Sequence, residues 1–101
     1  MTTEELVALF EKHEDEYYLE GVFHKPETYY GPTKRRDLNA FLLLERLVPG
    51  ERDMVSGAEH DEFFLDVDLE ELAKIATEED VKNLLRCGVV VSEHDCLRMN
   101  A

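Results

Sequence analysis

The chain has 101 residues, and its 24 Asp and Glu against 11 Lys and Arg give a formal net charge of −13. This length is enough for one domain and little more. Because 44% of the residues are hydrophobic, the chain can bury a core, which excludes a disordered acidic tail. No stretch approaches the roughly 20 apolar residues of a membrane span, and the first residues are acidic where a signal peptide is basic. We therefore expect a soluble cytoplasmic protein whose average surface repels nucleic acid.

The N-terminal third predicts one helix followed by a loop. Thr2 and Glu5 have the spacing of a capping box, and the apolar residues after them recur with helical periodicity, which predicts a helix over about 3–13. Residues 17–23 fit either a continuation of this helix or a strand, because Tyr17 keeps the helical phase in an aromatic-rich segment. Residues 25–33 contain two prolines and a glycine and predict a loop.

The next segment predicts a second helix, a loop and a strand. The helix opens at Thr33 or Asp37, continues through the apolar stretch 38–48 and ends at Pro49-Gly50. The polar residues 50–61 predict a loop, and residues 62–67 predict a short strand.

The C-terminal segment predicts two short helices and a hairpin. Asp68 and Thr77 each precede an acidic residue at capping-box spacing, which predicts that a helix begins after each of them. Gly88 ends the second of these helices. Residues 89–91 and 97–99 predict two strands joined by the polar turn 92–95.

The order from residue 37 onward is helix, strand, helix, helix, strand and strand. This order resembles that of a winged helix, a helix-turn-helix variant whose C-terminal hairpin is the wing. The resemblance covers about two thirds of the chain and rests on element order and apolar spacing, not on a motif. We therefore predict one α+β domain, with an N-terminal helix and an aromatic and basic loop over 1–33 and a winged-helix-like core over 34–101. The alternative is another α+β fold in which the same elements pack together.

The charge distribution disfavours the DNA-reading role that a winged helix implies. The helix that would enter the major groove begins with Glu78, Glu79 and Asp80, and phosphates repel carboxylates. Residues 51–101 hold 14 acidic and 5 basic residues, a local charge of −9. The same three carboxylates have a structural explanation, because they complement the positive end of the helix dipole.

Residues 24–36 oppose this trend, with four basic residues and one acid, a local charge of +3. Basic residues among aromatic ones can bind a peptide or a nucleic acid, or pair with the chain's own carboxylates. Tyr and Arg dominate interface energetics, so we predict a partner-binding set in and near this region. The set is Tyr17, Tyr18, Phe23, Tyr29, Tyr30, Lys34, Arg35 and Arg36.

The partner is expected to be a protein or a second copy of the chain. The helix over 38–48 has more apolar surface than one face of a small domain uses, which predicts a homodimer. We therefore predict a non-catalytic protein-interaction or regulatory module. Two alternatives stay open: a nucleic-acid mimic that inhibits a DNA-binding enzyme with a stripe of carboxylates, and a winged-helix transcriptional regulator.

Signatures of catalysis and metal binding are missing from the sequence. It contains no glycine-rich phosphate loop, no nucleophile-elbow motif and no zinc-binding spacing of His and Cys, so we expect no enzyme, no cofactor and no metal. The hairpin geometry places Cys87 and Cys96 too far apart for a disulfide, and we expect reduced thiols.

Overall fold

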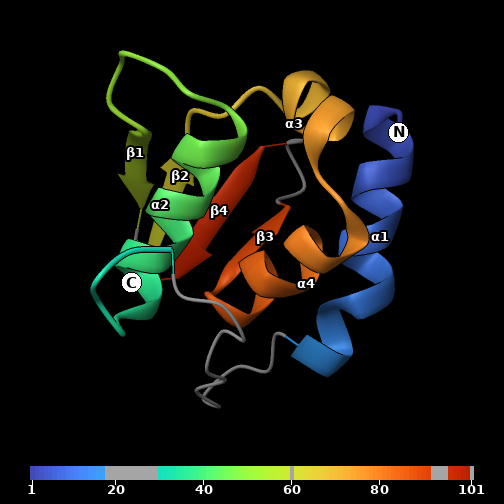
Figure 1. Cartoon of the computed structure of the whole chain (residues 1–101), viewed down its shortest axis with the longest axis horizontal. Coiled ribbons are helices and arrows are strands. Elements are labelled where there is room, and N and C mark those ends of the chain that lie inside the picture. Colours follow the sequence, from blue (N-terminus) through green and yellow to red (C-terminus); the bar gives the residue numbers. More distant parts are fainter. Residues whose placement is uncertain (18–29, 60, 92–95, 101) are drawn as a thin grey trace.

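A computed structural model describes residues 1–17, 30–59, 61–91 and 96–100. These residues form a small α+β domain with helices α1 (Thr3–Tyr17), α2 (Arg36–Leu47), α3 (Leu69–Ile75) and α4 (Glu78–Arg86). The strands are β1 (Val55–Glu59), β2 (Glu62–Leu65), β3 (Val89–Val91) and β4 (Leu97–Asn100). The order along the chain is α1, α2, β1, β2, α3, α4, β3 and β4 (Figure 1).

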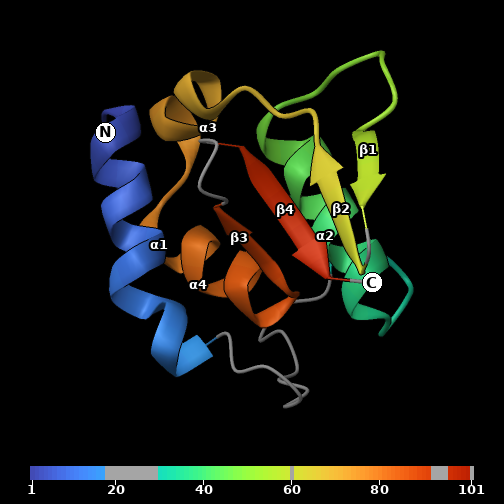
Figure 2. The ribbon, with the colours of Figure 1, turned by 180° about the vertical axis from the view of Figure 1, so that it is seen from behind.

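The four strands form one antiparallel sheet in the order β1-β2-β4-β3. Leu65 pairs with Leu97, and Leu97 pairs in turn with Val91, so residues from three strands line up across the sheet. The alternation of side chains places the buried Leu65, Leu97 and Met99 on one face, while Phe64 and Arg98 share the other. Figure 1 draws α2 in front of β2 and β4, and Figure 2 shows no described helix over the opposite side of these two strands.

The hydrophobic core lies between the helices and the sheet. Leu6 and Phe10 of α1, Leu43 and Leu44 of α2, and Leu84 of α4 are at most 2% exposed. Helix α1 packs along α4 and also contacts α3 and β3. It therefore stands at the opposite end of the molecule from β1 (Figures 1 and 2).

Local chemistry explains how most of these helices begin and end. Asp68 accepts hydrogen bonds from the backbone N–H groups of Glu70 and Glu71, and Thr77 forms a reciprocal capping box with Asp80. Gly88 follows the end of α4 with φ = +88°, a conformation that glycine adopts at little cost. These predicted boundaries are confirmed, as are the short strand after residue 61 and the two strands that flank residues 92–95.

Three predicted boundaries need correction. Helix α1 continues to Tyr17, so the helical alternative is correct for this residue, whereas residues 18–23 lie outside the described ranges. Helix α2 begins at Arg36 after Arg35, rather than at Thr33 or Asp37. The Thr33 hydroxyl bonds to the N–H of Arg35 instead, and Asp37 bonds to the adjacent N–H of Leu38.

The third correction concerns residues 50–61, which contain strand β1 rather than loop alone. The strand is mostly exposed, so it lacks the alternation of buried and exposed residues that marks a half-buried strand. It forms because β2 offers a free edge to pair with, and its register shifts between Val55 and Gly57. Such a bulge bends an edge strand and makes pairing with another chain less favourable.

Candidate interaction surfaces

The predicted aromatic and basic set falls into three groups. Tyr18, Phe23 and Tyr29 lie outside the described residues. Tyr17 and Tyr30 are half-buried and pack against the core. Lys34 and Arg35 are exposed, and Arg36 is half-buried. The five described residues therefore do not form one exposed patch, and only Lys34 and Arg35 are fully available to a partner.

Tyr17 lies at the end of α1 against the side of α4. The guanidinium carbon of Arg86 lies 4.4 Å from its ring centroid, and the Lys82 ammonium lies 5.7 Å away. The ring of His13 meets Tyr17 edge-on at 5.8 Å, and its Nε2 lies 3.1 Å from a carboxylate oxygen of Glu78. Cation–π contacts of this kind, partly desolvated, hold the two helices together.

Tyr30 continues this polar chain toward α2. Its hydroxyl accepts a hydrogen bond of 3.0 Å from the amide of Asn83, which accepts one of 2.9 Å from Arg86. The guanidinium of Arg46 lies 5.4 Å from the Tyr30 ring centroid. Burial raises the pKa of Tyr30, so its hydroxyl stays protonated across the neutral range. Tyr17 and Tyr30 thus connect α1, α4 and α2.

Arg36 has a structural position that its sequence context does not reveal. Its Nη2 lies 3.2 Å from the position that a Cβ atom would take at Gly88, just beyond the last turn of α4. A cation there complements the negative end of the α4 dipole. This placement explains a basic residue at the start of α2, where the dipole of its own helix disfavours one.

The outward face of α2 carries two exposed leucines, Leu38 at 43% and Leu42 at 39% of their full exposure. They lie four residues apart, one turn of helix, and the exposed Arg35 and Glu45 flank them three residues away on each side. We call these four residues the α2 stripe. A Cβ atom at Gly31 would lie 2.6 Å from Cδ1 of Leu42, so the segment before α2 lies directly against this leucine.

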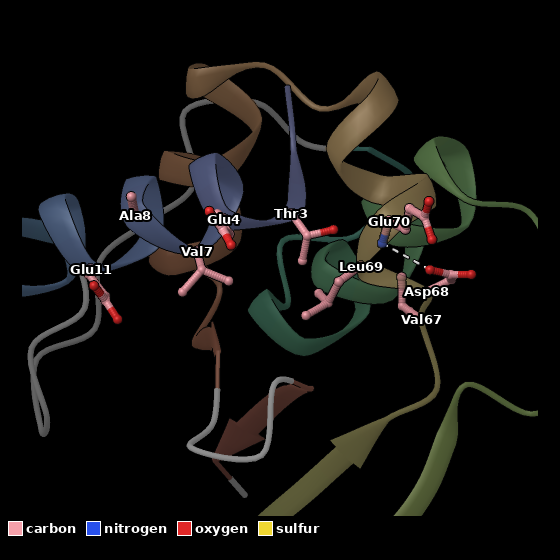
Figure 3. Close-up of a pocket in the computed structure, with 9 residues that line it drawn as sticks. All are labelled: Thr3, Glu4, Val7, Ala8, Glu11, Val67, Asp68, Leu69 and Glu70. Carbon is pink, nitrogen blue, oxygen red and sulfur yellow. Dashed lines mark hydrogen bonds between the residues drawn. The ribbon is translucent and has the colours of Figure 1, made fainter.

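A groove of about 600 Å³ lies between α1 and the beginning of α3 (Figure 3). Val7 and Ala8 line it from α1, and Val67 and Leu69 line it from the other side. Its four charged side chains are all carboxylates, contributed by Glu4, Glu11, Asp68 and Glu70. We call this feature the acidic groove. The sequence does not reveal it, because residues more than 50 positions apart form its two walls.

Helix α4 presents little surface to an outside molecule. Five of its residues are buried, including the polar Asn83 and Arg86, and α1 packs along it. Its exposed residues are Glu78 and Glu79. The side of α4 that faces solvent is therefore acidic.

Exposed carboxylates are spread over the described part of the molecule. Glu4, Glu11 and Asp15 on α1 are exposed, and so is Glu59 at the end of β1. Because α1 and β1 lie at opposite ends of the molecule, the carboxylates are not confined to one face (Figures 1 and 2).

The chemistry of the remaining side chains is limited in the described ranges. Within them, no three His, Cys, Asp or Glu side chains are arranged to hold a metal ion, and no helix is long and apolar enough to cross a membrane. Neither Cys87 nor Cys96 takes part in a disulfide, and burial raises the pKa of the Cys87 thiol to about 11. A thiol that is protonated at neutral pH is a weak nucleophile.

Of the α2 stripe, Arg35 belongs to the predicted partner-binding set, whereas Leu38, Leu42 and Glu45 do not. The spacing of three, four and three residues from Arg35 to Glu45 is a signal in the sequence that distinguishes the α2 stripe from the buried side of the helix. The chain as a whole matches no protein-family model, no curated protein and no solved structure.

Proposed function

We propose that the protein is a non-catalytic protein-interaction module that self-associates through the α2 stripe. The observation that carries the proposal is the pair of adjacent leucines, Leu38 and Leu42, left exposed on a strongly acidic surface. An exposed apolar patch with a charged rim is typical of a contact surface. The homodimer predicted from the apolar content of residues 38–48 thereby acquires a specific contact.

The α2 stripe is complementary to itself. When two copies of the helix pack antiparallel about a twofold axis, Leu38 of one copy meets Leu42 of the other. Arg35 then lies opposite Glu45 at both ends of the contact. A twofold interface repeats every contact, so one favourable pair becomes two. The pairing also gives the Arg35 cation a partner of opposite charge.

A charge-swap experiment tests this arrangement by sedimentation equilibrium at micromolar concentration. We expect a dimer for the wild type and a monomer for the double variant Leu38→Ser, Leu42→Ser. Arg35→Glu alone and Glu45→Arg alone each place like charges opposite one another, and we expect each to weaken self-association by about tenfold or more.

Mixing the two single variants is the decisive measurement. In an antiparallel mixed dimer every Glu again faces an Arg, so the mixture should regain the wild-type dissociation constant. A Lys34→Glu variant is the control, because Lys34 precedes the stripe, and it should dimerise like the wild type. A monomeric wild type, or a mixture that fails to recover, contradicts the proposal.

The element order from α2 onward, apart from the added strand β1, supports a winged-helix-like fold for residues 34–101. In this interpretation β3 and β4 are the wing, α4 corresponds to the helix with which DNA-binding winged helices read bases, and β2-β4-β3 is the three-stranded sheet. Strand β1 then extends this sheet at one edge, and α1 is the N-terminal extension.

The burial of α4 favours protein interaction over transcriptional regulation by direct DNA contact. A recognition helix needs exposed side chains that reach base edges, whereas α4 exposes two glutamates. Nucleic-acid mimicry stays an alternative, but it needs carboxylates concentrated on one face, and here they lie on elements at opposite ends. The absence of catalysis and of a cofactor, and a location in the cytoplasm, remain parts of the proposal. The location is supported by two cysteines that form no disulfide.

A further inference from the structure

We infer that the acidic groove binds a short basic segment of a partner protein that carries aliphatic side chains among its lysines or arginines. The inference concerns α1 and α3 and does not depend on self-association through α2. It rests on two properties of the groove, which are the apolar character of its centre and the single sign of its charges.

The apolar centre selects for aliphatic side chains. Val7 is half-buried and Ala8 is exposed on α1, and the half-buried Val67 faces them from the segment before α3. Leu69, which is 7% exposed, is the most buried of the residues that line the groove. Covering partly exposed apolar area is favourable by roughly 25 cal/mol for each Å² removed from water. A volume of about 600 Å³ is within the usual range of binding clefts.

The carboxylates select for cations. Glu4 and Glu11 lie two turns apart on one side of α1, and Val7 lies between them (Figure 3). Glu70, in the first turn of α3, also lines the groove. Asp68 is already occupied in part, because one of its oxygens accepts the N–H of Glu70 at 2.9 Å. No lysine or arginine lines the groove, so nothing in its lining neutralises these charges.

The two properties together define the partner chemistry. A small cation satisfies the carboxylates and leaves the apolar centre in water, while an apolar ligand leaves the carboxylates without partners. A basic segment with aliphatic side chains satisfies both, since lysine and arginine also cover apolar surface with their own methylene chains. The net charge of −13 increases the rate at which such a segment is encountered.

The test is a titration of the full-length protein, labelled at its methyl groups, followed by NMR. The probe is a synthetic helical peptide of lysine and leucine with its leucines on one side. Two comparison ligands are the same peptide with serine in place of leucine, and spermine. We expect the lysine–leucine peptide to shift the methyl signals of Val7, Val67 and Leu69, and to bind at least about tenfold more tightly than either comparison ligand.

Two charge-matched variants separate the groove from the general acidity of the protein. Glu4→Lys with Glu11→Lys and Asp15→Lys with Glu16→Lys both change α1 and both raise the net charge by four. All four positions are exposed, so both proteins should fold, and their circular dichroism spectra check this. We expect the first variant to lose about tenfold or more in affinity, and the second about twofold.

A third variant tests the apolar centre without changing any charge. Ala8→Trp fills the groove from the exposed side of α1, and it should weaken binding of the lysine–leucine peptide by about tenfold. The inference is wrong if both charge variants lose affinity equally, if spermine binds as tightly as the peptide, or if the shifted signals lie away from the groove.

Discussion

At the scale of single residues, buried polar groups connect segments that the hydrophobic core alone does not align. Asn39 is 0% exposed, and its amide makes three hydrogen bonds. Its oxygen accepts the N–H of Tyr30 at 2.7 Å, and its nitrogen donates to the carbonyl oxygens of Thr33 and Arg35. Helix α2 thus lacks a side-chain N-cap, but one of its own residues organises the segment before it.

Cys87 gives a prediction about pH. Burial raises its pKa to about 11 in the folded protein, whereas the same thiol in the unfolded chain has a pKa near 9.0. Below both values the thiol is protonated in both states, so stability does not depend on it. As the pH rises from about 9 to 11 the unfolded state loses its proton first, so the free energy of unfolding should fall.

Urea unfolding at a series of pH values measures this effect, with Cys87→Ala as the reference. The wild type should lose more stability than the variant between pH 9 and pH 11, and a parallel decline of the two proteins contradicts the assignment. A second readout is thiol labelling at neutral pH. The half-exposed Cys96 should react in the native state, and Cys87 only after unfolding.

The residue scale also marks a limit of prediction from sequence. In the sequence, Asn39 and Asn83 are polar residues that interrupt the apolar pattern of a helix. Both are buried because each forms a hydrogen bond with Tyr30, which is nine residues from Asn39 and 53 residues from Asn83. Tyr17 and Tyr30 were predicted to bind a partner. Their aromatic character does not reveal that Arg86 and Asn83 of α4 contact them.

At the scale of elements, the predictable helices are those whose ends are specified locally. Both α3 and α4 begin at a side chain that bonds to backbone N–H groups within three residues, a relation visible in the sequence. Strand β1 was missed because its stability comes from pairing with β2, a relation between segments. The acidic groove is likewise a product of packing between α1 and the start of α3.

The capping box of α4 gives a prediction about stability. Thr77→Ala removes the hydroxyl that accepts the N–H of Asp80 at 3.2 Å, and it should lower the free energy of unfolding by about 1 kcal/mol. Thr77→Ser keeps the acceptor and should stay close to the wild type.

Thr2 provides the matched comparison, because it forms the same box with Glu5 at the start of α1. Thr77 lies in the short connection between α3 and α4, so the loss of its cap disturbs both helices, whereas Thr2 caps α1 alone. Thr2→Ala should therefore cost less than Thr77→Ala. Urea unfolding of the variants measures the differences. Equal losses at the two positions contradict the argument that the Thr77 cap affects two helices.

At the scale of the whole molecule, attraction between neighbouring charges competes with repulsion among all of them. The described ion pairs include Lys74 with Glu71 and Arg52 with Asp66, in which the basic side chains are 62% and 85% exposed. Exposed pairs contribute roughly 0–1 kcal/mol each. The domain carries an excess of 13 negative charges, and charges closer together than the screening length repel one another. This repulsion opposes folding.

The repulsion should prevail, which predicts that sodium chloride stabilises the protein. Raising its concentration from 10 to 200 mM shortens the screening length from roughly 30 Å to less than about 8 Å, so distant repulsion weakens more than contact pairs do. We expect the free energy of unfolding in urea to rise by on the order of 1 kcal/mol. The double variant Asp15→Asn, Glu16→Gln removes two charges at the negative end of α1 and should be more stable at low salt, with a smaller gain from added salt. A loss of stability on adding salt instead means that the surface ion pairs outweigh the net charge.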